Sequence, residues 1–374
     1  MAMPIKGCYR AVEAGQPGCP VLLAGLKEPL LLPGALRRCS WPALSWADLQ
    51  VLHREHGHRK VALRFGALSA SRTPWEGQCE RLEDVQLGDF CKWLVDQEAP
   101  SISHRKDEWW GYCSYQHFEA LFEDMEDSNR AAANFAELLK EKPSVPGAPT
   151  LWLGSKGART PCHQDAYGHN IVAQIAGEKL WLLFDPSSSW LGGHRLPFED
   201  SSTFTDLDPL EEEIPQRFTG LRTTLHPGDV LVIPRHWFHA VECTSSWSLS
   251  LNQWLDAPGD AEQRVHEAIA RCLASPLLEV RPEGWWLNPD EDLLETSENI
   301  EFLMSALQVQ LGREVSASAV HAALLRAATR PEVVSSIVGL VASDLHRQLE
   351  AEDKEKYVGR LRVTDYLCPP SCMS

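Results

Sequence analysis

The strongest constraint on the fold is a series of short apolar runs, separated by turn residues, between residues 150 and 256. Many short antiparallel strands at this spacing predict a sandwich or a closed barrel. We further predict that two turns, one at Gly177 and Glu178 and one at 226–229, each join two paired strands. The predicted strands are 150–154, 169–176, 179–184, 223–225, 230–234, 239–243 and 248–254.

The pattern changes on both sides of this segment. Before it, we predict helices at 46–53, 87–96 and 115–126, a strand at 61–65 and a proline-rich break at 142–149. After residue 256, apolar residues recur every three or four positions, which predicts helices at 261–273, 292–311, 319–328 and 333–349. We therefore expect a mainly β domain at 1–258, with its barrel strands mainly at 149–256, and a C-terminal helical region at 259–374.

Charge and cysteine usage limit the class of protein. The chain carries 35 basic and 52 acidic side chains, a net charge of −17, whereas nucleic-acid binders carry a basic footprint. An anionic membrane surface is disfavoured for the same reason. The N-terminus lacks the apolar core of a signal peptide, and no apolar run is long enough to span a bilayer. The 11 cysteines form no CxxC pair and indicate reduced thiols, so we expect a cytoplasmic or nuclear protein that is not secreted.

A candidate metal site begins with His163 and Asp165. Residues two apart on a strand point to the same face, so this imidazole and this carboxylate can converge on one ion. His239 opens a later predicted strand and supplies a third ligand. Two histidines and one carboxylate on a barrel wall match the facial triad of iron(II) oxygenases. Zinc or manganese in an isomerase would use the same residue types, and three separate hydrogen-bonded structural residues are the other alternative.

Two other residue sets compete with this assignment. His236 lies three residues before His239 and could replace it, although it falls in a predicted turn. His117 and Glu119 form a second pair two residues apart. We predict a helix at 115–126, where residues two apart do not share a face, so this pair is disfavoured.

Polar residues on the predicted strands suggest further parts of a site. Lys179 begins the strand that we predict to pair with the one carrying Asn170. A lysine turned into a barrel is costly without an anion, which a bound dicarboxylate would provide; a solvated lysine at a hairpin corner is the alternative. One face of strand 248–254 forms a polar stripe, which fits a site wall or ordinary solvent exposure, and consists of Ser248, Ser250, Asn252 and Trp254.

Three segments together resemble the JmjC family of iron(II)- and 2-oxoglutarate-dependent oxygenases. They are LWLGSKGARTPCHQDAYGHNIVAQIAGEKLWLLFDP, HPGDVLVIPRHWFHAVE and SLSLNQW, and WPALSWADL matches a feature found upstream in that family. The resemblance covers about residues 20–256. It implies a double-stranded β-helix, the jelly-roll barrel of cupins and JmjC proteins.

The resemblance also implies roles for residues of this chain. It makes His163, Asp165 and His239 the ligands of iron(II), with 2-oxoglutarate as co-substrate. It implies that Lys179 pairs with the distal carboxylate of 2-oxoglutarate, helped by the Thr160 hydroxyl. Three more positions match the co-substrate pocket: Tyr112, Asn170 and Asn252.

The function implied by the resemblance is hydroxylation of a protein side chain. Asp165 in place of a glutamate, and the absence of a visible chromatin-reading module, favour a hydroxylase over a lysine demethylase. The strings DQEAPSIS and WWGYCSYQHFEALFED resemble more closely a JmjC group that associates with a small heat-shock protein. A scaffold that binds such a partner with little or no catalysis is therefore the main alternative. A tRNA-modifying hydroxylase is a further alternative, which the net charge disfavours.

Two more regions bear on partners. The stretch 185–217 is rich in acidic residues and favours either a basic peptide as substrate or a solvated flap. The helices after 259 are expected either to form a homodimer or to cover the base of the barrel. We expect no membrane partner.

Overall fold

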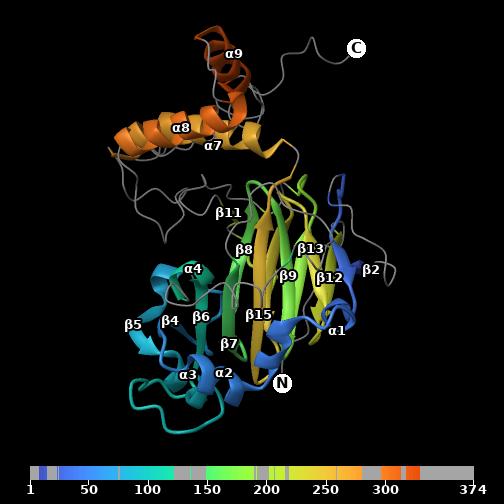
Figure 1. The fold of residues 1–374 in the computed structure, drawn as a ribbon, viewed down its shortest axis with the longest axis vertical. Coiled ribbons are helices and arrows are strands. Elements are labelled where there is room, and N and C mark those ends of the chain that lie inside the picture. The colour runs from blue at the N-terminus through green and yellow to red at the C-terminus, as the bar shows by residue number, and fades with distance from the viewer. Residues whose placement is uncertain are drawn as a thin grey trace, which may run out of the picture. The chain divides into compact units, whose positions relative to one another are not determined.

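The computed structural model describes most of the strand-rich segment and parts of the flanking regions. The described residues are 8–14, 23, 25–74, 76–121, 135, 149–188, 191, 202–205, 207–214, 219–257, 259–279, 296–312 and 317–328. The chain divides into two compact units (Figure 1). The first contains Met1–Asp260 with Leu287–Asp292, and the second contains Ala261–Trp286 with Leu293–Ser374.

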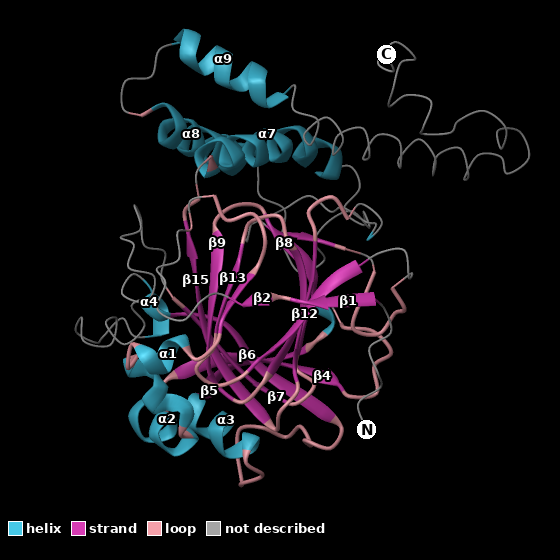
Figure 2. Ribbon diagram, turned by 90° about the vertical axis from the view of Figure 1, so that its right-hand side faces the viewer, coloured by secondary structure: helices cyan, strands magenta, loops and turns pink. Residues whose placement is uncertain are grey.

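The first unit is built on two β-sheets, whose central strands lie on opposite sides of a barrel (Figure 2). Within the described residues, the smaller sheet has the order β1 (Cys8–Ala11), β12 (Thr219–Leu225), β10 (Lys179–Phe184), β14 (Phe238–Cys243), β8 (Arg159–Asp165) and β11 (Ser202–Phe204). The larger sheet has the order β2 (Glu13–Ala14), β3 (Leu30–Leu32), β13 (Val230–Ile233), β9 (His169–Ala176), β15 (Trp247–Leu255), β7 (Thr150–Ser155), β6 (Trp109–His117), β4 (Lys60–Ala67) and β5 (Glu80–Gln86). This arrangement confirms the predicted jelly-roll barrel.

The chain passes from one sheet to the other at each tight turn. The predictions of strands at 169–176 and 179–184 are confirmed as β9 and β10. The predicted hairpin between them is wrong, because β9 pairs with β13 and β15 while β10 pairs with β12 and β14. The turn at 226–229 likewise leads from β12 to β13, which lie in different sheets. A tight turn reverses the backbone locally, but the burial of each apolar strand decides which partner it pairs with.

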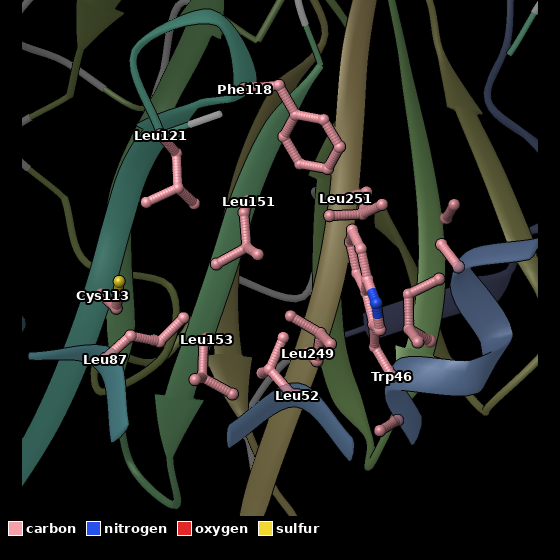
Figure 3. Close-up of a cluster of buried hydrophobic side chains, with 14 of the residues drawn as sticks. Trp46, Leu52, Leu87, Cys113, Phe118, Leu121, Leu151, Leu153, Leu249 and Leu251 are labelled. Carbon is pink, nitrogen blue, oxygen red and sulfur yellow. The ribbon is translucent and has the colours of Figure 1, made fainter. Parts of the chain in front are cut away.

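Short helices cover the outer face of the larger sheet. They are α1 (Ala35–Arg38), η1 (Pro42–Ala47), α2 (Leu49–His56), α3 (Leu87–Leu94) and α4 (Phe118–Leu121); a further short helix, η2 (Glu76–Gln78), precedes β5. Trp46 and Leu52 from these helices face Leu249 and Leu251 of β15 (Figure 3). These four side chains are almost fully buried in one apolar cluster, which fixes the outward face of β15.

The structure corrects one predicted helix. The helices predicted at 46–53 and 87–96 correspond to η1 with α2 and to α3, and the strand at 61–65 lies in β4. The helix predicted at 115–126 is wrong at its start, since β6 continues to His117 and α4 follows. Pairing of β6 with β4 and β7 overrides the local helical spacing there. Residues 122–126 and 142–148 lie outside the described residues.

The second unit is helical where it is described. It contains α7 (Asp260–Glu279), α8 (Thr296–Leu311) and α9 (Ala317–Ala328), which correspond to three of the predicted helices. An apolar cluster joins the three helices through Val265, Ala268, Ile269, Ala306, Leu307 and Ala323. The helix predicted at 333–349 lies outside the described residues. Among the described residues, no helix combines the length and the apolar character needed to cross a bilayer.

Candidate metal centre

The structure brings His163, Asp165 and His239 together inside the barrel. His163 on β8 lies directly opposite His239 on β14, and their ring centroids are 4.2 Å apart. One ligand atom from each of the three residues lies within 4.8 Å of the others, and all three side chains are buried. In the described part of the chain, no other group of three such side chains lies close enough to hold an ion.

Backbone carbonyls orient both imidazoles in the same way. The Nδ1 atom of His163 is 2.8 Å from the carbonyl oxygen of Pro161, and the Nδ1 atom of His239 is 2.9 Å from that of Trp237. A carbonyl oxygen only accepts, so Nδ1 carries the proton in each ring. Both Nε2 atoms therefore keep a lone pair for a metal ion.

The third member, Asp165, is a buried carboxylate with a one-sided set of donors. Its Oδ2 atom accepts hydrogen bonds from Trp254 Nε1 at 3.0 Å and from Asn170 Nδ2 at 3.2 Å. Burial opposes the negative charge, but His239, His163 and these donors outweigh it and hold the pKa of Asp165 below its ordinary value. Asp165 is thus suited to remain an anion in the barrel.

The competing residues lie differently. His236 has a φ of 66° in a turn, and its Nε2 atom is 2.8 Å from the carbonyl oxygen of Ala166. His117 is the last residue of β6, so our helical argument against it is wrong. Its Nδ1 atom lies 3.0 Å from Thr150 Oγ1, and His117 does not belong to the three-residue group.

The metal ligands face a cavity of about 260 Å³ between the two sheets. All five residues predicted to contact the co-substrate line it: Tyr112, Thr160, Asn170, Lys179 and Asn252. Ser250 and Trp254 of the predicted polar stripe also line it, and lining residues to which the sequence assigned no role include Tyr115, Trp152, Trp181 and Ser202. Trp152 could have been found, because it alternates with the core residues Leu151 and Leu153 on β7.

A bulge in β8 places Thr160 on the same wall as His163. Thr160 pairs with Val241 and His163 pairs with His239, so Pro161 and Cys162 together lie opposite Ala240 alone. Side chains alternate along a regular strand, and residues three apart would point to opposite faces. The extra residue restores a common direction, and both Thr160 and His163 line the cavity.

Lys179 is a buried amine that lines the cavity. It is 2% exposed, which contradicts the alternative of a solvated corner residue. It pairs with Leu225 and Cys243, so the predicted pairing of its strand with that of Asn170 is wrong. Its Nζ atom donates to Ser250 Oγ at 2.7 Å and to Tyr112 Oη at 3.2 Å.

The surroundings of this amine favour an anion. Burial lowers the pKa of Lys179 to about 8. Burial also raises the pKa of the neighbouring Cys243 thiol, which therefore stays neutral. None of the ion pairs among the described residues includes Lys179, and its two hydrogen-bond partners are neutral hydroxyls. A bound carboxylate would supply the missing counter-charge.

The polar face of β15 lies toward the cavity, as one of the two readings of its sequence predicts. Asn252 Nδ2 donates to Asn170 Oδ1 at 2.9 Å, and Trp152 Nε1 donates to Asn252 Oδ1 at 2.8 Å. Leu249 and Leu251 point to the opposite face, into the apolar core. The two asparagine amides thus contact each other and, through Asn170, the carboxylate of Asp165.

The described part of the acidic stretch is bound to the barrel unit. Glu211 pairs with Arg159, and Glu212 lies 2.8 Å from Arg72. Asp208 accepts a hydrogen bond from the Thr73 amide at 2.6 Å. The other acidic residues of this stretch include Glu199, Asp200 and Asp206, which lie outside the described residues.

The donor set suits iron(II). Two neutral imidazoles and one carboxylate are ligands that iron(II), manganese(II) and zinc(II) accept. All three come from one sheet, β8 and β14, so the remaining coordination positions face the cavity. The residues present therefore fit a metal ion that also binds a small molecule.

Comparison with known proteins relates the first unit to a described family. A profile of the cupin-like domain matches residues 23–261. The chain is 36% identical over 278 residues to HSPB1-associated protein 1 of Bos taurus, covering 70% of this chain and 55% of that protein. The chain thus spans little more than half the length of this relative.

More distant relatives carry JmjC names. The Jumonji C domain-containing protein 5 of Drosophila melanogaster is 28% identical over 235 residues, covering 61% of this chain and 54% of that protein. The bifunctional peptidase and (3S)-lysyl hydroxylase JMJD7 of Homo sapiens is 28% identical over 149 residues, covering 33% of this chain and 46% of that protein. The region that matches the cupin-like profile, residues 23–261, includes β8 and β14, the strands that carry the three candidate metal ligands of this chain.

Proposed function

Because the chain belongs to the cupin-like family, we propose that it is an iron(II)- and 2-oxoglutarate-dependent dioxygenase that hydroxylates a protein side chain. One observation carries this proposal: a single cavity holds both the three-residue metal group and the buried amine of Lys179. A metal ion and a buried cation in one cavity suit a ligand with a chelating end and a carboxylate end. 2-Oxoglutarate has both.

Residues of this chain bind and orient the co-substrate. The Lys179 ammonium and the Thr160 hydroxyl bind the distal carboxylate. Tyr112 Oη accepts a hydrogen bond from Lys179 and donates its own proton to the same carboxylate. Ser250 fixes the direction of the amine. When bound, iron(II) and 2-oxoglutarate would activate dioxygen, the oxidant, so that one oxygen atom enters a C–H bond of the substrate and the other enters the succinate that remains after 2-oxoglutarate loses carbon dioxide. Aromatic side chains, Trp152 and Trp254 among them, line the cavity and limit the entry of water.

The substrate class is proposed from the family and from the names of two relatives. JMJD7 is named as a lysyl hydroxylase, and the bovine relative is named for association with HSPB1. We therefore propose a protein substrate, with a small heat-shock protein as a candidate. The second proposal is a scaffold that binds such a protein with little catalysis. The buried triad favours catalysis, since a scaffold has no need of three convergent ligands.

Self-association through the C-terminal helices is also proposed. Ile300, Met304 and Val309 on α8 are each about half exposed or more, which is unusual for large apolar side chains in one helix. Sedimentation at micromolar concentration should show a dimer. A monomer under these conditions would remove this proposal.

The decisive experiment is anaerobic titration of 2-oxoglutarate into protein loaded with iron(II). We expect a visible metal-to-ligand charge-transfer band, which is lost in His163→Ala and weakened in Lys179→Ala. Succinate release with candidate protein substrates then tests turnover. Binding of a small heat-shock protein that survives in His163→Ala, with no succinate from any substrate, would favour the scaffold.

A further inference from the structure

The two oxygen atoms of Asp165 have different surroundings. We propose that Trp254 and Asn170 restrict Asp165 to metal binding through Oδ1 alone, and that Asn252 and Trp152 hold Asn170 in the required orientation. The inference rests on the metal site of the proposed function. It assigns positioning roles to four side chains that do not themselves bind the metal.

Oδ2 is occupied by donors from the protein. Trp254 Nε1 lies 3.0 Å away and Asn170 Nδ2 lies 3.2 Å away. Oδ1 faces the imidazoles, with His163 Nε2 at 3.8 Å, and has one long contact of 3.5 Å to Ser202 Oγ. Only Oδ1 thus retains a free lone pair on the side of the two histidines.

Hydrogen bonds link Trp152, Asn252, Asn170 and Asp165 in series, and Trp152 sets their direction. An indole N–H can only donate, so Trp152 Nε1 must face the oxygen of the Asn252 amide. The NH₂ group of Asn252 then faces the oxygen of Asn170. This leaves the NH₂ group of Asn170 to face Asp165. Neither amide can flip without breaking at least two of these bonds.

This arrangement matters for the open positions on the metal. An octahedral ion with three protein ligand atoms keeps three positions on the cavity side. A carboxylate that bound through both oxygens would take one of them. Two donors on Oδ2 disfavour that mode, because at least one of the two hydrogen bonds would have to break in a buried site. The four side chains therefore preserve room for a bidentate co-substrate and oxygen.

Cobalt(II) titration of the metal-free protein tests the inference without reference to activity. Cobalt(II) accepts the same ligands, and its visible absorption reports the number of ligand atoms. In Trp254→Phe and in Trp152→Phe, we expect the dissociation constant to rise about tenfold and the intensity of the band to change. Both residues are only partly buried, so both variants are expected to fold, which a thermal unfolding scan checks.

Trp93→Phe is the matched control. Its Nε1 atom donates to the carbonyl oxygen of His104 at 2.7 Å, and Trp93 does not line the cavity. This variant should bind cobalt(II) as the parent does, with the same band. Parental affinity and spectrum in both Trp254→Phe and Trp152→Phe would overturn the positioning role while leaving the metal site intact. A parent chain that binds no cobalt(II) would instead overturn the proposed function together with this inference.

Discussion

His163 and His239 face each other as a register pair across two neighbouring strands, with their ring centroids 4.2 Å apart. The pair comes from β8 and β14, which are far apart in the sequence and adjacent in the smaller sheet. The position of the candidate metal site is therefore fixed by backbone hydrogen bonds rather than by a flexible loop. This has consequences that mutation can measure.

His239→Ala should lower metal affinity by more than about 100-fold, because a ligand contributes more than the outer residues that orient it. His236→Ala should leave the affinity unchanged, since the His236 ring contacts the carbonyl oxygen of Ala166 outside the three-residue group. Calorimetric titration with manganese(II) compares the two variants. The reverse order of effects would mean that the wrong histidine has been assigned.

Binding of 2-oxoglutarate should weaken as the pH rises above about 8, where free Lys179 loses its proton. Above this pKa the affinity should fall by up to about tenfold per pH unit, since the carboxylate requires the ammonium form. Calorimetry on the manganese-loaded protein at several pH values measures the profile. Lys179→Met should bind weakly with no such dependence, and an unchanged affinity for the parent up to about pH 10 would contradict the assignment.

Lys179→Met should make the ligand-free protein more stable at neutral pH. The pKa of Lys179 is lowered from 10.5 to about 8 by burial, so the charged form costs folding free energy below pH 8. Removal of this charge should raise the free energy of unfolding by about 1–3 kcal/mol, reduced by the loss of two hydrogen bonds.

The lowered pKa of Lys179 also determines how the free energy of unfolding depends on pH. Between about pH 8 and about pH 10.5 the unfolded chain holds the proton more tightly, so the stability of the parent rises with pH in this window. The advantage of Lys179→Met should shrink over the same range. Urea unfolding at several pH values measures both chains, and a variant less stable than the parent at neutral pH would show that burial of the charge is not costly.

Gly177→Ala should destabilise the barrel unit strongly. Gly177 has a φ of 63°, and a Cβ atom at this position would collide with the carbonyl oxygen of Trp247. Gly25 also has a positive φ, of 95°, but a Cβ there meets nothing within 4 Å. Gly25→Ala should therefore cost only about 1–2 kcal/mol, and Gly177→Ala about 1–3 kcal/mol more. Equal losses in urea unfolding would show that the turn between the sheets can relax.

The sequence predicted local features well because they depend on near neighbours. The apolar runs that became β9 and β10 are readable from their length and the turn residues between them, and the shared direction of His163 and Asp165 is readable from alternation. The pairing of strands was not readable, since the turn at Gly177 reverses the chain in the same way whether its strands share a sheet or not.

Tertiary contacts decided the remaining differences. The apolar spacing after Tyr115 predicted a helix, yet Tyr115 lies in β6. It has a φ of 53° at an irregularity in the pairing of β6 with β7. The side-chain donors to Asp165 come from three other strands, β9, β11 and β15, and hydrogen bonds between distant strands leave no local pattern. Alternation on β15 did place Trp254 on the face of Asn252, which was the available signal.

The bulge in β8 sets the spacing between two residues that line the cavity, Thr160 and His163. Because Thr160 and His163 share a wall only through the extra residue at Pro161 and Cys162, the spacing between this hydroxyl and this metal ligand is set by the backbone of β8. In the proposed function, side-chain substitutions would change how tightly a dicarboxylate is held, whereas the preferred length of the ligand would also depend on the register of β8. For the proposed site, discrimination among dicarboxylates would thus depend on strand register.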